Sequence, residues 1–267
     1  MKFAFSANAF RRYDLLDTIG ILADLGYQGI EILADIPHAY PPDLKSEDIE
    51  KIKTALNYNE LSVSNINAFM LHGIQDTYHP SWIEQDPSKR AQRIDYTLQC
   101  IDLAAQLGID ILSTEPGGPL LGIDEQVGLS FFKEGLAAVY EKAKDKGVRI
   151  LIEPEPGLLI ENSFQLRSFL EDLDPEVFGL NFDIGHFFCV GEDPSACIRE
   201  MRDVIYHFHL EDIAATREHH HLLPGKGAID FSRVMEAIQD IEYDGFITVE
   251  LYPYELVDLH RDKAQRL

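Results

Sequence analysis

Four side chains in the second half of the chain combine residue types and positions that are typical of a metal site. Each lies at the end of a short apolar run, in the sequences RILIE, GLNFD, IYHFH and ITVE. If these runs are parallel strands of one barrel, the four side chains meet at its carboxyl edge. Three carboxylates and one imidazole suit Mn²⁺, Mg²⁺, Co²⁺ or Zn²⁺. We therefore predict one divalent metal ion, held by Glu153, Asp183, His209 and Glu250.

An isolated carboxylate at a strand end has a simpler explanation, because such groups often cap the next helix or bind a loop amide. That explanation weakens when four such residues close four consecutive runs. Carboxylates brought so close would also raise one another's pKa unless a cation neutralised them. The group as a whole favours a metal over four independent caps.

Further polar residues are expected near the same edge. His186 lies three residues beyond Asp183, Asn67 lies on the third apolar run, and Glu115 follows the fourth. We expect His186, Asn67 and Glu115 to contact a substrate, while a loop-ordering role for Glu115 stays equally open. The run His219–His221 either binds a metal or is merely solvated on a loop.

Short β-rich runs alternate with longer helical patterns along the whole chain. In the helical segments apolar residues recur every three or four positions, and Gly26, Gly108 and Gly147 follow the ends of three of them. The predicted strands are Lys2–Phe5, Gln28–Leu33, Leu61–Ala68, Asp110–Thr114, Arg149–Glu153, Gly179–Asp183, Ile205–Leu210 and Phe246–Leu251. The predicted helices are Leu15–Leu25, Ser46–Asn57, Ser88–Leu107, Asp124–Lys146, Ser163–Leu170, Pro194–Met201 and Phe231–Ile241. The tail from Tyr254 is expected to add only a short last helix.

This order of elements predicts an α/β fold, a single (β/α)8 TIM barrel spanning residues 1–267. The length fits, since such a barrel usually needs about 250 residues. A doubly wound open sheet is the structural alternative. The first strand–helix turn, SANAFRRYD, lacks the GxGxxG phosphate loop that would favour that alternative.

Composition narrows the class of partner. The net charge is −23, from 46 acidic against 23 basic residues, so the surface repels phosphate backbones and anionic lipids. Neither nucleic acid nor a membrane is an expected partner. Three cysteines without CxxC spacing suggest no disulfide framework. With no apolar stretch near the roughly 20 residues that span a bilayer, we expect a soluble, cytoplasmic protein.

The chain resembles the xylose isomerase-like TIM barrel superfamily, which holds sugar and sugar-phosphate isomerases and epimerases, inosose-processing enzymes and the endonuclease IV branch. The likeness covers nearly the whole chain in its strand–helix order, and its motifs are concentrated in residues 150–252. The resemblance is carried by Glu153, by Asp183-x-x-His186, by the sequences HLED and HLLPGKG, and by Glu250. It implies a metal-dependent enzyme with a small carbohydrate or polyol as its substrate. Barrels of this group are often dimers or tetramers, so a homo-oligomer is left open.

In the ketose 3-epimerase branch, the residues that match Glu153 and Glu250 bind the metal and also move the proton. The residues that match Asp183 and His209 are ligands, and the one that matches His186 touches the substrate. An arginine of that branch has no close match here, and Arg217 lies two residues beyond its place. We assign the substrate contact to Arg217.

A second departure concerns a glutamate that the epimerase branch carries soon after its strand-five glutamate. Here that region reads Gly157-Leu158-Leu159. The endonuclease branch uses three zinc ions, and two histidines that hold its first ion are replaced by Asn67 and Glu115. This argues against DNA repair. The place of its third ion falls near His186, His219 and His221, which leaves open a second metal at these three residues.

The leading hypothesis is therefore a metal-dependent isomerase or epimerase that transfers a proton next to a carbonyl, with Glu153 and Glu250 as the catalytic groups. Three alternatives stay open. The same ligands would serve a lyase that eliminates water from a polyol ketone, or a hydrolase. A metal-binding scaffold without activity is the third.

Overall fold

Eight parallel strands close into one barrel in the computed structural model, which describes residues 1–71 and 76–252. Each strand pairs with the next along the chain, and β1 pairs with β8 to complete the ring. The strands are β1 Lys2–Ser6, β2 Gly29–Leu33, β3 Ser62–Asn67, β4 Ile111–Thr114, β5 Arg149–Ile152, β6 Phe178–Asp183, β7 Ile205–Leu210 and β8 Phe246–Val249. The predicted (β/α)8 barrel is confirmed.

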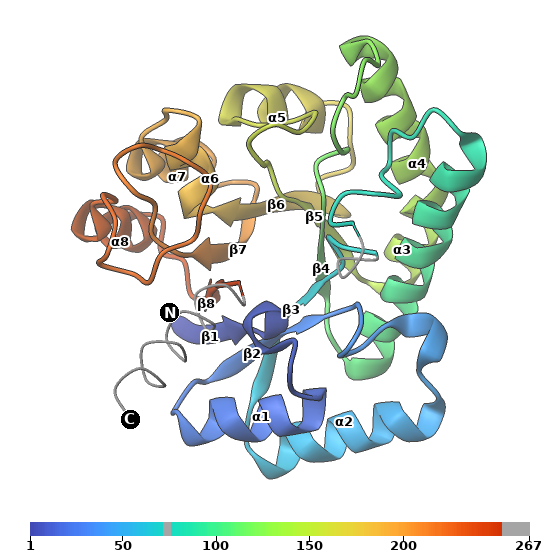
Figure 1. Ribbon diagram of the computed structural model, residues 1–267, viewed down its shortest axis with the longest axis vertical. Coiled ribbons are helices and arrows are strands. Elements are labelled where there is room, and N and C mark those ends of the chain that lie inside the picture. Colours follow the sequence, from blue (N-terminus) through green and yellow to red (C-terminus); the bar gives the residue numbers. More distant parts are fainter. Residues whose placement is uncertain (72–75, 253–267) are drawn as a thin grey trace, which may run out of the picture.

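The helices surround the ring of strands, as Figure 1 shows. They are α1 Leu15–Asp24, α2 Ser46–Tyr58, α3 Pro87–Leu107, α4 Glu125–Lys146, α5 Ser163–Leu170, α6 Ile184–Cys189, α7 Pro194–Glu200 and α8 Phe231–Asp240, with short 3-10 turns η1 Ala7–Phe10 and η2 Pro41–Asp43. None of the helices in the described ranges is long and apolar enough to cross a membrane.

Local sequence signals set the limits of the two longest helices. The side chain of Asp86 accepts a hydrogen bond from the Ser88 amide at the start of α3, and Asp124 caps α4 in the same way. Both helices end at glycines with positive φ, Gly108 at 75° and Gly147 at 65°. This left-handed conformation suits glycine, which has no Cβ to clash.

The structure differs from the sequence prediction after β6 and at the ends of several strands. The residues after β6, expected as a loop, form helix α6, because Asp183 caps it by accepting the His186 amide at 2.7 Å. Strands β5 and β8 end at Ile152 and Val249, one and two residues earlier than predicted. The predicted tail helix beyond Tyr254 lies outside the described residues.

Polar side chains fill part of the barrel interior. Ser64 of β3 meets Thr248 of β8 at 3.0 Å, and Thr248 also contacts Nε2 of His207 at 2.8 Å. Nδ1 of His207 lies 2.8 Å from Oδ1 of Asn181 on β6. Burial lowers the pKa of His207 to about 3, so its ring is neutral. This chain of hydrogen bonds fixes the inner side chains beneath the carboxyl edge.

Candidate metal centre and its surroundings

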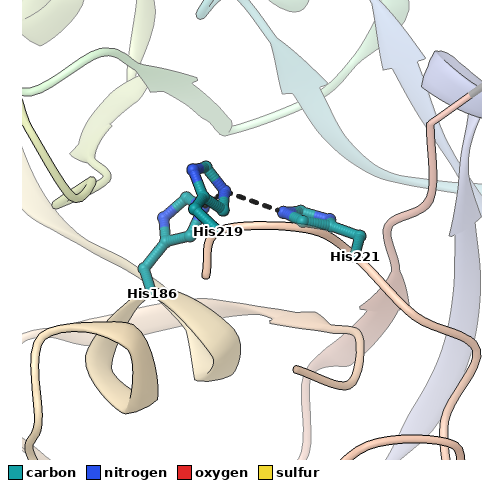
Figure 2. A group of neighbouring side chains, drawn as sticks. All are labelled: His186, His219 and His221. Carbon is teal, nitrogen blue, oxygen red and sulfur yellow. Dashed lines mark hydrogen bonds between the residues drawn. The ribbon is translucent and has the colours of Figure 1, made fainter. Parts of the chain in front are cut away.

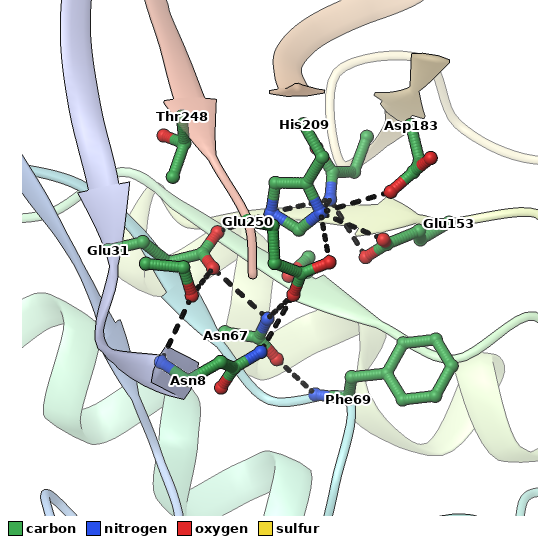
Figure 3. Close-up of polar contacts among 12 residues, drawn as sticks. Asn8, Glu31, Asn67, Phe69, Glu153, Asp183, His209, Thr248 and Glu250 are labelled. Carbon is green, nitrogen blue, oxygen red and sulfur yellow. Dashed lines mark hydrogen bonds and ion pairs between the residues drawn. The ribbon is translucent and has the colours of Figure 1, made fainter. Parts of the chain in front are cut away.

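The predicted quartet converges at the carboxyl edge of the barrel (Figure 3). Glu153 and Glu250 directly follow β5 and β8, Asp183 ends β6, and His209 is the penultimate residue of β7. Nδ1 of His209 lies 2.9 Å from Glu153 Oε1, 3.4 Å from Glu250 Oε2 and 3.7 Å from Asp183 Oδ2. One donor atom from each residue falls within 4.8 Å of the others, and all four side chains are buried. A single cation could contact them together.

The hydrogen bonds of the quartet leave oxygens free to face that common point. Asn181 donates to Glu153 Oε2 at 2.8 Å, and Asn8 donates to Glu250 Oε1 at 2.7 Å. Asp183 Oδ1 is occupied by the helix cap, whereas its buried Oδ2 accepts no N–H donor from the described residues. The neighbouring carboxyl of Glu211, when protonated, is a further hydrogen-bond partner of Asp183. Buried carboxylates with so few donors are costly unless a cation neutralises them. These residues therefore fit a divalent metal.

Charge within the quartet is unevenly distributed. Burial works against the charged form of His209, yet Glu153, Glu31 and Glu250 together raise the pKa of this imidazole well above its usual value. Burial raises the pKa of Glu250 well above its usual range, and the charges of Glu153 and Asp183 add to this effect. The carboxylates that would bind a cation thus also favour the protonated form of His209.

Three histidines form a second cluster beside the quartet (Figure 2). Nε2 of His219 lies 2.9 Å from Nε2 of His186 and 3.0 Å from Nε2 of His221. Nδ1 of His186 contacts Pro154 O at 2.8 Å, and Nδ1 of His221 contacts Glu250 O at 3.1 Å. Since a carbonyl only accepts, these Nδ1 atoms carry the hydrogens, and Nε2 is the atom of each ring that faces the other histidines. Burial works against the charged form of His186, but the charges of Asp183, Glu155 and Glu153 raise its pKa above the usual value.

The cluster adjoins the quartet through Asp183, whose Oδ2 lies 3.6 Å from Nε2 of His186. Burial lowers the pKa of His219 to about 3 and that of His221 to about 4, with the neighbouring His186 adding to both effects. Both rings are therefore neutral near pH 7 and can act as ligands. The structure brings His219, which is exposed, and the buried His221 together with His186, so these three rings could hold a second cation.

The loop that carries His219 and His221 is held by one carboxylate. Asp212, after β7, accepts the amides of Gly225 at 2.9 Å, Gly227 at 2.7 Å and Ile229 at 3.2 Å. A Cβ at position 227 would lie 2.3 Å from Asp212 Oδ1, so the second glycine of PGKG is needed for this approach. The glycine amides therefore bind the carboxylate of Asp212. This contact holds the loop so that His219 and His221 lie over the barrel.

A second glycine is required at the start of α6. A Cβ at Gly185 would lie 1.8 Å from Oε1 of Glu211, the residue that follows β7. Burial and the charge of Asp183 raise the pKa of Glu211 well above its usual range. The sequence Asp-Ile-Gly-His thus lets α6 pack directly against a buried carboxyl group and places His186 next to Asp183.

The predicted substrate-contacting residues have different surroundings. Asn67 is buried and donates to Glu31 Oε1 at 3.1 Å and to Glu250 Oε1 at 3.5 Å, so it holds carboxylates of the centre. Arg217, on an exposed loop, donates to Phe188 O, and its guanidinium lies 4.4 Å from the Phe188 ring centroid. The structure brings Asn67 and His186 to the centre, whereas Arg217 lies on the face of α6.

Glu115 is fully buried and orders a loop. Its Oε1 accepts the amide of Trp82 at 3.0 Å and lies 3.7 Å from Nη2 of Arg93 on α3. Arg93 also donates to the carbonyls of Pro80 and Phe69, both at 2.9 Å. Burial raises the pKa of Glu115 to about 7. The loop-ordering alternative for Glu115 is therefore the better description of its contacts.

Two further carboxylates near the centre were not identified from the sequence. Glu31 of β2 lies 2.7 Å from Nε2 of His209. Burial opposes its ionisation, but the charge of His209 holds the pKa of Glu31 at about 2. Glu155 lies two residues beyond Glu153, accepts the Tyr78 hydroxyl at 2.7 Å, and has a pKa raised to about 7 by burial. A charged residue inside the apolar strand GIEIL was the available signal for Glu31.

Comparisons with known proteins agree with this architecture. Inosose dehydratase from Lacticaseibacillus casei is 33% identical over 132 residues, which are 43% of this chain and 44% of that enzyme. That match thus spans less than half of the relative's own length. Fructoselysine 3-epimerase from Shigella flexneri is 26% identical over 235 residues, covering 86% of this chain and 82% of that enzyme.

A solved structure of the IolI protein with a bound zinc atom shares the fold. The TM-score is 0.79 at 18% identity, over 96% of this chain and 91% of that one. The family described as xylose isomerase-like TIM barrel matches residues 19–266. The chain belongs to the xylose isomerase-like TIM barrel family.

Proposed function

We propose that this protein is a divalent-metal-dependent isomerase or epimerase of a small sugar or polyol ketone. The observation that carries the proposal is the buried convergence of Glu153, Asp183, His209 and Glu250, in which Asp183 Oδ2 accepts no N–H donor among residues 1–71 and 76–252. These four residues would hold the cation. When bound, it supplies a Lewis acid that stabilises negative charge developing on a carbonyl oxygen.

The two glutamates are the groups that move the proton. They reach the His209 ring from β5 and β8, and an amide fixes one oxygen of each, from Asn181 for Glu153 and from Asn8 for Glu250. The other oxygens, Glu153 Oε1 and Glu250 Oε2, face the common point. One carboxylate removes a proton from the carbon next to the carbonyl, and the other returns a proton to the opposite face.

The relatives and the net charge support this substrate class. An epimerase that acts on fructoselysine matches most of the chain, and a zinc-binding protein shares the fold. The net charge of −23 disfavours a polyanionic partner such as nucleic acid. His186, which lies between the quartet and the other two histidines, is the residue we assign to a substrate oxygen when no second cation is bound.

A lyase that eliminates water from a hydroxy ketone is the second candidate. Such an elimination starts with the same proton removal and then needs an acid for the departing hydroxide. Glu155, with a pKa near 7 and a position two residues beyond Glu153, suits that task. The similarity to inosose dehydratase points in the same direction.

One experiment separates the two reactions and tests both. The protein is loaded in turn with Mn²⁺, Mg²⁺, Co²⁺ and Zn²⁺, mixed with ketohexoses or inososes in deuterated water, and followed by mass spectrometry. We expect uptake of one deuterium by a product that is otherwise unchanged in mass. Loss of one water would identify the lyase. Tight metal binding without either change in any of these ketones would contradict the proposed activity.

We propose in addition that His186, His219 and His221 hold a second cation. Three imidazoles favour Zn²⁺ or Co²⁺ over Mg²⁺, whereas the carboxylate-rich quartet also accepts Mn²⁺ and Mg²⁺. His219→Ala is expected to lower bound zinc from about two ions to about one per chain, measured by elemental analysis after gel filtration. The neighbouring His220→Ala is the matched control and should keep the wild-type stoichiometry. Equal zinc content in both variants would argue against the second site.

A further inference from the structure

The two ring nitrogens of His209 face different carboxylates. Nδ1 faces the quartet, 2.9 Å from Glu153 Oε1 and 3.4 Å from Glu250 Oε2. Nε2 lies 2.7 Å from Oε2 of Glu31. Glu31 belongs to β2 and His209 to β7, which are not neighbours in the ring, so this contact crosses the interior of the barrel (Figure 3). Glu31 therefore contacts the His209 ring on the side that faces away from the quartet.

The carboxylate of Glu31 is itself fixed by donors on both oxygens. Ser6 donates to Oε1 at 2.7 Å and Asn67 to the same oxygen at 3.1 Å, while Asn65 donates to Oε2 at 2.9 Å. Both oxygens of Glu31 thus already act as acceptors, and its position does not depend on His209 alone. An ionised carboxylate only accepts, so the nitrogen that faces it must carry the hydrogen. In the neutral His209 ring the lone pair is then on Nδ1.

An alternative is that Glu31 and His209 bind a metal ion together with His207. One ligand atom from each of these residues also lies within 4.8 Å of the others. The hydrogen bonds disfavour it. Both nitrogens of His207 are engaged, with Asn181 at 2.8 Å and with Thr248 at 2.8 Å. Both oxygens of Glu31 accept donors, as described above. In the quartet, by contrast, Asp183 Oδ2 accepts no N–H donor from any described residue.

We infer that Glu31 is a positioning residue for the proposed metal centre, whose carboxylate holds Nε2–H of His209 and so directs the Nδ1 lone pair at the quartet. The inference rests on the proposed function, because it concerns the same metal. Hydrogen bonds from a ligating histidine to a carboxylate fix the tautomer and the ring plane. Here that carboxylate comes from a strand three positions away from β7 in the ring, so β2 takes part in metal binding without a ligand of its own.

The first test uses the wild-type protein loaded with Zn²⁺ and labelled with ¹⁵N at histidine. We expect the His209 signals to show a protonated Nε2 and a zinc-bound Nδ1. A zinc-bound Nε2 would overturn the assignment. This measurement needs no variant, so it cannot fail through misfolding, and absence of zinc at His209 would instead contradict the proposed function itself.

The second test compares variants by their affinity for Mn²⁺, which the quartet accepts and the three-histidine cluster does not favour. Loss of such an outer contact typically weakens metal binding by 10- to 100-fold, so we expect roughly this loss in Glu31→Gln and a smaller one in Glu31→Asp. Free Mn²⁺ is measured by electron paramagnetic resonance. Glu115→Gln, which neutralises another fully buried carboxylate, is the control for general destabilisation.

The outcomes separate positioning from structural support. Lower thermal stability in both Gln variants, with weaker Mn²⁺ binding only in Glu31→Gln, is the expected result. Wild-type Mn²⁺ affinity in a folded Glu31→Gln or Glu31→Asp protein would overturn the inference. Equal losses of affinity in Glu31→Gln and Glu115→Gln would overturn it as well, because the effect would then be unspecific. A wild-type protein that binds no Mn²⁺ would contradict the proposed function.

Discussion

Replacing Glu153 or Glu250 by glutamine is expected to reduce turnover by about 10²- to 10⁴-fold, the usual contribution of a general acid or base. Glutamine keeps the size of the side chain and a carbonyl oxygen for the cation, but it cannot accept the substrate proton. Part of the metal affinity should therefore remain. Turnover is followed with the ketone and metal identified by the deuterium experiment, and bound metal is measured on the same samples.

The two variants should also differ from each other. If the glutamates act on opposite faces of the reacting carbon, Glu153→Gln blocks solvent exchange with one epimer and Glu250→Gln blocks it with the other. Exchange is measured separately with each purified epimer in deuterated water. Glu236→Gln, on the exposed side of α8, serves as the matched control and should react like the wild type. Full turnover in both glutamine variants would remove Glu153 and Glu250 from the mechanism.

The barrel and its quartet could be predicted because both depend on local pattern. Each quartet residue ends an apolar run, and the parallel order of the runs brings their ends to one edge. No knowledge of which strands face each other is needed for that conclusion. The same reasoning located His186, since it follows Asp183 by three residues. The structure differs only in making that segment a helix.

Contacts across the barrel could not be predicted in this way. Glu31 meets His209 over a separation of 178 residues, and a strand pattern gives no information about the partner on the opposite wall. Arg93 lies in the middle of a helix, where an arginine is normally exposed, yet it is fully buried against Glu115 and three carbonyl groups. The course of a loop could not be predicted either. Arg217 packs against Phe188 because α6 provides a ring and a carbonyl there.

Polar residues inside the barrel show a further limit. Alternation along a strand predicts which side chains share a face, but both faces of β2 and β6 are buried here, so hydrophobicity does not alternate. In the sequence, Asn181 and Glu31 are then recognisable only as polar residues within apolar runs. Their role becomes visible when Asn181 is seen to hold Glu153 and Glu31 to hold His209. The residues that surround a site can be identified only from the structure, even when its ligands can be predicted from the sequence.

Removing the metal is expected to lower the unfolding temperature as well as to abolish turnover. A ligand at 1,000 times its dissociation constant stabilises the folded state by about 4 kcal/mol, which corresponds to roughly 10 °C for a chain of this size. The gain is large because the cation neutralises carboxylates that burial keeps away from water. Calorimetry with chelator and with added Mn²⁺ measures the difference.

The rise in unfolding temperature that the metal causes should also depend on pH. The neighbouring Glu153, Glu31 and Glu250 raise the pKa of His209, so protons compete with the metal for Nδ1 as pH falls. We expect the metal-induced rise to shrink as pH falls through the raised pKa of His209, because a protonated ring has no lone pair for the cation. In Asp183→Asn, which keeps the cap of α6 but loses the ligand charge, the rise should be largely absent at every pH. An undiminished rise at low pH, or in Asp183→Asn, would place the metal elsewhere in the protein.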